Sequence, residues 1–172
     1  MIPKVKKILY ATDLSKNSAY ALRYAANYAK QNDAEVVILH VMTVIDTNTY
    51  NIMAAQIGEK LVAEKTKERE DHAKDRIIKR LKVFYEKVRA EDPEIKDPKV
   101  SIEVSRGYPA EEILSMTDKL NCDIIIMGTH GKGIVNQTFL GSMAKKVLRR
   151  TRKPVFIIPL PKEESDLTFH DI

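Results

Sequence analysis

The chain has 172 residues, of which 44% are hydrophobic, enough for one globular domain with a sizeable apolar core. Its net charge of +5 comes from 29 basic and 24 acidic residues, a balance too even to indicate nucleic-acid binding. No apolar run approaches the ~20 residues that a membrane-spanning helix needs, and we expect no signal peptide at the N-terminus. The single cysteine, Cys122, excludes an internal disulfide framework, so we expect a cytoplasmic protein.

Strand-like and helix-like segments alternate along the first half of the chain. Residues 5–12 predict a strand, and Asp13 or Ser15 can cap a helix that ends near residue 32. The apolar face of that helix should be buried, and it comprises Ala19, Leu22, Ala26 and Ala29. Residues 35–41 predict a second strand, and residues 42–50 predict a loop.

A helical excursion is predicted at about residues 50–92, with residues 56–90 forming one long helix or two in series. Its C-terminal half carries an apolar stripe, namely Ile77, Leu81, Phe84 and Val88. Residues 64–76 are mostly charged and have almost nothing to bury. They predict either a helix that projects into solvent or a poorly ordered segment.

The second half repeats the strand–helix alternation in a more compact form. Residues 99–105 and 123–127 predict strands, and Pro109 suits the first position of the helix between them. A further helix from about Ser142 should bury four residues, namely Met143, Ala144, Val147 and Leu148. Residues 154–159 predict a last strand, and residues 162–172 a C-terminal tail.

Five strands separated by helices predict an α/β fold: an open, doubly wound, five-stranded parallel sheet with helices on both faces, Rossmann-like, in a single domain over residues 1–161. In such sheets, ligands bind at the carboxyl ends of the strands, where the winding direction reverses. Asp13, Val41 and Gly128 all follow or end predicted strands. The sequence therefore predicts that these three residues surround one crevice.

Four of the six glycines lie between positions 128 and 141. A buried strand, a glycine-rich loop and a helix N-terminus together predict a phosphate site, because free backbone N–H groups point at the ligand. Neither familiar nucleotide motif is present. Ile134 follows Gly133 where a P-loop needs lysine, and Asn136 stands where a dinucleotide fingerprint needs its third glycine.

The spacing Gly128, two residues, Gly131, nine residues, Gly141-Ser142 resembles the nucleotide-binding branch of the universal stress protein family. Segments 7–15, 37–41 and 107–113 extend the resemblance, which covers roughly residues 4–160. Residues 42–98 match the family only in position and helical character.

The resemblance implies a domain that binds ATP or AMP, with Mg²⁺ or Mn²⁺ held through the phosphates. It implies that Asp13, with Ala11 and Thr12 beside it, contacts the ribose or adenine side, and that the backbone of Val41 contacts adenine. The ribose and phosphates would be lined by Met127, Gly128, His130 and Gly131. The phosphate oxygens would be held by Gly141, Ser142 and Met143. Family members commonly dimerise through their last strands, here Val155 to Ile158, whose apolar edge would be a liability if left uncovered.

Simpler interpretations compete with several of these roles. The glycines could be turn residues, Asp13 could be only a helix cap, and His130 has no carboxylate partner nearby in the sequence. The stripe of Tyr20, Tyr24 and Tyr28 indicates packing or a hydrated interface rather than base stacking. The basic residues between 145 and 153 are favoured electrostatically near a helix C-terminus, so they need not indicate nucleic-acid binding.

Three functional hypotheses follow. The first is a regulatory protein that senses or is switched by ATP or AMP. The second is a slow ATPase, although the sequence offers no nucleophile–base pair and no paired acidic metal ligands, so we assign no catalytic or metal-ligating residue. The third is an interaction module that recruits a protein partner through residues 64–76.

Overall fold

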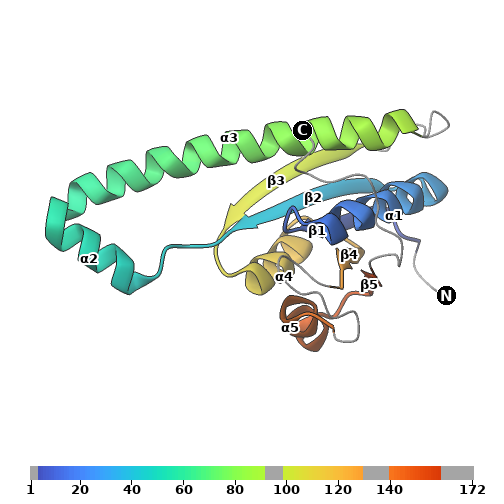
Figure 1. Cartoon of the computed structure of the whole chain (residues 1–172). Coiled ribbons are helices and arrows are strands. Elements are labelled where there is room, and N and C mark those ends of the chain that lie inside the picture. Colours follow the sequence, from blue (N-terminus) through green and yellow to red (C-terminus); the bar gives the residue numbers. More distant parts are fainter. Residues whose placement is uncertain (1–3, 92–98, 130–139, 160–172) are drawn as a thin grey trace.

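A parallel sheet of five strands forms the centre of the computed structural model, which describes residues 4–91, 99–129 and 140–159 (Figure 1). The strand order is β3-β2-β1-β4-β5, so the winding reverses between β1 and β4. The elements are β1 Lys7–Thr12, α1 Lys16–Asn32, β2 Glu35–Met42, α2 Thr47–Ile57, α3 Glu59–Glu91, β3 Val100–Arg106, α4 Pro109–Lys119, β4 Ile124–Gly128, α5 Ser142–Arg150 and β5 Val155–Ile158. The predicted fold class is confirmed.

The alternation of side chains along each strand explains why helices cover both faces of the sheet. Ile8 and Tyr10 of β1 pack on one face with residues of α1 and α3. Leu9 and Ala11 pack on the opposite face with residues of α4 and α5. Each large apolar side chain removed from water in this way contributes about 1.5–3 kcal/mol to folding.

The first helix has the boundaries and the buried face that its sequence predicts. Ser15 is the N-cap residue, and its hydroxyl accepts a hydrogen bond from the Ser18 N–H at 3.3 Å. The helix ends at Asp33, whose φ of 53° is left-handed. The predicted buried residues, Ala19, Leu22, Ala26 and Ala29, are all at most 1% exposed.

The helical excursion begins earlier than predicted and is divided into two helices. The loop predicted over residues 42–50 is too long, because α2 already begins at Thr47. Its N-cap is Asp46, whose carboxylate accepts the Thr49 N–H at 3.0 Å. The break between the two helices falls at Gly58, with φ of 87°, a conformation that glycine adopts at little cost. Residues 64–76 are helical, so the alternative of a poorly ordered segment is wrong.

Figure 1 shows α2 and the first half of α3 extending away from the sheet, whereas the second half of α3 runs along it. Leu81 and Phe84 of that second half are fully buried, and α2 buries no residue. No helix in the described ranges is long and apolar enough to cross a membrane. In α5, Ala144 and Val147 are buried as predicted, but Leu148 is 41% exposed because it lies off the face that meets the sheet.

Candidate functional site

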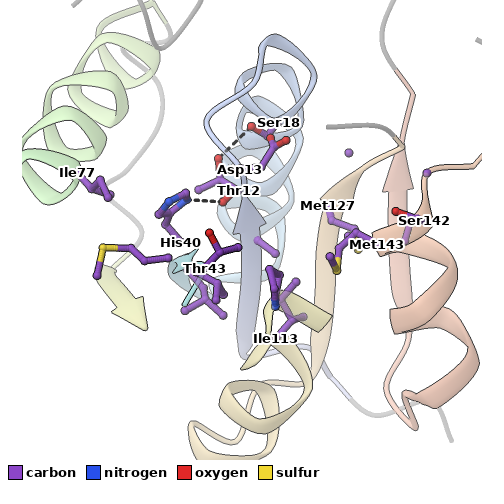
Figure 2. Close-up of a pocket in the computed structure, with 18 of the residues that line it drawn as sticks. Thr12, Asp13, Ser18, His40, Thr43, Ile77, Ile113, Met127, Ser142 and Met143 are labelled. Atoms are coloured by element: carbon purple, nitrogen blue, oxygen red, sulfur yellow. Dashed lines mark hydrogen bonds between the residues drawn. The ribbon is translucent and has the colours of Figure 1, made fainter. Parts of the chain in front are cut away.

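A cavity of about 620 Å³ opens at the carboxyl ends of β1, β2 and β4 (Figure 2). Every described residue of the predicted binding set lines it: Ala11, Thr12, Asp13, Val41, Met127, Gly128, Gly141, Ser142 and Met143. The other two residues of the set, His130 and Gly131, lie outside the described residues. The prediction that Asp13, Val41 and Gly128 surround one crevice is confirmed.

The loop after β1 is held by its own side chains. The Thr12 hydroxyl accepts the Leu14 N–H at 3.1 Å, and the Asp13 carboxylate accepts the Ser15 N–H at 3.0 Å. Leu14 has a φ of 63°, which is costly for a residue with a side chain. Burial of the Leu14 side chain, only 6% exposed, offsets that cost. The loop therefore presents Asp13 to the cavity in a fixed position.

The two ends of the glycine-rich segment are fastened to the sheet and to each other. The Gly141 N–H donates to the Thr129 carbonyl at 2.8 Å, and the Thr129 N–H donates to the Ile158 carbonyl at 3.0 Å. Gly141 is the N-cap of α5 and supplies no side-chain cap. The first-turn N–H groups and the positive end of the helix dipole lie beside the cavity, which suits this end for binding an anion.

His40, at the carboxyl end of β2, also lines the cavity. Its Nδ1 lies 2.8 Å from the Thr12 carbonyl oxygen, which can only accept, so Nδ1 carries a proton. This contact joins the ends of β1 and β2. The rule that selects strand ends, which identifies Val41, could also have placed His40 at the site.

Two residues of α3, Ala73 and Ile77, line the cavity and were not predicted to do so. They lie in or next to the charged stretch that sequence analysis expects to project into solvent. They reach the site because α3 passes over the ends of β2 and β3 on its way out from the sheet. No local pattern in the sequence indicates this, since the contact joins segments far apart in the chain.

The cavity extends from α3 to the N-terminus of α5. Figure 2 shows Ile77, His40 and Thr43 on one side, Ser142 and Met143 on the other, and Asp13 between them. Asp13 is the one carboxylate among the described lining residues. Within the described ranges, no group of three or more histidine, cysteine, aspartate or glutamate side chains could hold a metal ion.

Two tyrosine contacts and a buried cysteine lie outside the cavity. Tyr28 stacks edge-on against Phe156 of β5, with ring centroids 5.0 Å apart, and Tyr20 meets Tyr24 in the same manner at 5.3 Å. Cys122 is fully buried, and burial raises the pKa of its thiol to about 11. These residues stabilise the fold and lie outside the cavity lining.

The model of the universal stress protein family matches residues 4–159. The chain belongs to this family. It is 33% identical over 159 residues to universal stress protein MJ0531 of Methanocaldococcus jannaschii, covering 92% of this chain and 85% of the relative. It is 30% identical over 153 residues to universal stress protein MJ0577 of the same organism, covering 89% and 94%.

Solved structures show the same fold. The structure of MJ0577 superposes with a TM-score of 0.68 at 27% identity, covering 94% of this universal stress protein and 100% of that chain. A universal stress protein solved in complex with cAMP matches with a TM-score of 0.58 at 17% identity, covering 91% and 98%. One from Archaeoglobus fulgidus, in complex with dAMP, matches with a TM-score of 0.55 at 18% identity, covering 91% and 99%.

Proposed function

We propose that this universal stress protein binds an adenine nucleotide, ATP or AMP, in the cavity and acts in the cytoplasm as a regulatory protein that the nucleotide switches. The observation that carries the proposal is the order of groups across the cavity. The N-terminus of α5 lies at one side, Asp13 lies in the middle, and Ile77 of α3 lies with His40 and Thr43 at the other side. This order matches the phosphate, ribose and base of a nucleotide.

Two further points support this assignment. The glycine spacing resembles the nucleotide-binding branch of the family, and two proteins of this fold were solved with cAMP and dAMP, both adenine nucleotides. Mg²⁺ or Mn²⁺ would be held through the phosphate oxygens of the nucleotide, a common mode of Mg²⁺ binding.

The first experiment is to denature the freshly purified protein and identify the released nucleotide by mass spectrometry, together with calorimetric titration of the nucleotide-free protein with ATP and AMP. Stoichiometric ATP would support a sensor with negligible turnover. Stoichiometric ADP would favour the slow ATPase instead. A protein that releases no nucleotide and shows no heat of binding with either ligand would refute the proposal.

Variants at the phosphate end test the site itself. Gly141→Val places a branched side chain at the N-terminus of α5 and should abolish measurable ATP binding. Ser142→Ala removes one hydroxyl and should weaken ATP binding roughly tenfold. Ser115→Ala, at an exposed serine of α4, is the matched control and should change nothing. Circular dichroism shows whether each variant is folded, and unchanged affinity in folded Gly141→Val would disprove the assignment.

We further propose that two copies pair through β5, which lies at one edge of the sheet. Phe156 is 36% exposed there, and an uncovered apolar edge strand invites pairing. Sedimentation velocity should give a dimer for the wild type and a monomer for Phe156→Lys. A wild-type monomer at high concentration would exclude this interface.

A second candidate function is recruitment of a protein partner by the projecting helices, with nucleotide as the signal. The observation in its favour is that Ile52, Ile57 and Leu61 are 61%, 45% and 43% exposed on α2 and the start of α3. A double variant, Ile52→Glu with Ile57→Glu, should lose any partner that the wild type binds while it retains nucleotide. If partner binding survives this change, recruitment through these helices is excluded.

A further inference from the structure

One wall of the cavity comes from α3, an element outside the glycine-rich segment. Ala73 and Ile77 are four residues apart, so they lie on the same face of the helix in consecutive turns. Both are partly buried, and both line the cavity. His40 and Met42, at the end of β2, line the cavity as well, and the alternation of the strand places both on the sheet face that α3 covers. A slot lined by Ala73, Ile77, Met42 and His40 thus lies between α3 and the end of β2.

This slot lies at the side of the cavity away from α5. Figure 2 shows Ile77 beside His40 and Thr43, and Ser142 on the far side of Asp13. A nucleotide whose phosphates lie at the N-terminus of α5 and whose ribose lies near Asp13 would direct its base toward α3. The aliphatic side chains of Ala73 and Ile77 on one side and of Met42 on the other suit the flat faces of a purine, which lose little by leaving water.

Contacts on either side of Ala73 and Ile77 along α3 determine where these two residues lie. Leu81, one turn beyond Ile77, is fully buried against the sheet. On the other side, the Arg106 guanidinium of β3 forms an ion pair with the Glu70 carboxylate at 3.0 Å. The Gly107 N–H donates to the Met42 carbonyl at 3.0 Å, which joins the ends of β2 and β3. These contacts therefore hold both α3 and the end of β2, the two elements that form the slot, in place.

We infer that Ala73 and Ile77 form one wall of the base subsite and determine which bases the protein accepts. This inference rests on the proposed function. It assigns to α3 a part in ligand recognition, and it links the bound base directly to the helix that carries the projecting segment. The short side chain of Ala73 leaves room for the base, and the branched side chain of Ile77 closes the slot one turn further along.

The direct test is methyl NMR of the full-length protein labelled at isoleucine, titrated with ATP and, separately, with inorganic tripolyphosphate. The Ile77 methyl resonance should shift with ATP through the ring current of the base and stay in place with tripolyphosphate. Ile52, which is 61% exposed on α2, serves as the internal control. Saturation with ATP without a shift at Ile77 would overturn the inference while leaving the proposed function intact.

A pair of variants on α3 provides an independent test. Ala73→Phe fills the slot and should weaken ATP binding roughly ten- to a hundredfold, because a tightly packed site does not accept added bulk. Ala63→Phe makes the same change at an exposed position of α3 and should leave ATP affinity unchanged. Unaltered ATP affinity in Ala73→Phe would overturn the inference. If the wild type binds no adenine nucleotide, the proposed function fails and the inference falls with it.

Discussion

The two halves of α3 are one continuous helix, but they stand in different environments. From Ile77 onward, the helix packs along the sheet, and Leu81 and Phe84 are fully buried. Before that point it carries mostly charged side chains and extends beyond the sheet with α2 (Figure 1). Helical structure therefore does not reveal where stability resides. Stability depends on the apolar area that each turn buries, and the site lies at the boundary between the two halves.

The largest difference in stability should appear when a leucine is replaced by alanine in each half of α3. Leu81→Ala removes a side chain that is 0% exposed and should lower the free energy of unfolding by about 2–5 kcal/mol. Leu61→Ala, at a position 43% exposed, should lower it by less than ~0.5 kcal/mol. Urea denaturation of both variants measures the contrast. Equal losses of unfolding free energy would mean that Leu61 is as well covered as Leu81, which would contradict the contrast between the two halves.

The buried thiol in the body of the protein should make stability depend on pH. Burial raises the pKa of Cys122 from near 9 to about 11, so the folded state holds its proton over a range where the unfolded chain loses it. This contribution is complete below pH 9 and is lost as pH rises from 9 to 11. It amounts to at most ~2–3 kcal/mol.

Urea denaturation of the wild type and of Cys122→Ala, at intervals from pH 8 to 11, measures this contribution. The stability difference between the two proteins should stay constant up to pH 9 and then shift against the wild type. Parallel curves across the whole range would show that the thiol titrates alike in the folded and unfolded chain. No such dependence is expected from the projecting helices, which contain no cysteine.

The smallest effect should come from the ion pair that joins the two regions. Glu70→Gln removes the charge that pairs with Arg106, and both side chains are partly exposed, at 27% and 45%. Global stability should change by less than ~1 kcal/mol. Hydrogen exchange of residues 66–74 should nevertheless become faster, because the pair tethers the helix where it leaves the sheet. Glu68→Gln, at an exposed position of the same helix, is the control.

Much of the fold follows from local patterns. Alternating apolar strands and helices predict the doubly wound sheet, and Pro109 begins a helix as its fixed φ favours. Two other features could not be predicted from local patterns. The N-terminus of α2 was missed because Asp46 caps a helix of low amphipathicity that buries none of its residues, so no periodic pattern reveals it. Leu148 was misassigned because an apolar residue can lie on an exposed face.

Part of the candidate site could likewise be predicted from local patterns and part could not. Asp13, Val41 and Gly128 could be placed at one crevice because each ends or follows a strand, and parallel strands bring those ends together. Strand-end positions are therefore enough to predict the fold class and the side of the cavity around Asp13 and Gly128. That α3 closes the opposite side with Ala73 and Ile77 follows only from packing between segments far apart in the chain. Their position depends on where a long helix crosses the sheet, and this is determined by packing at Leu81 and Phe84 rather than by any pattern in the residues that line the cavity.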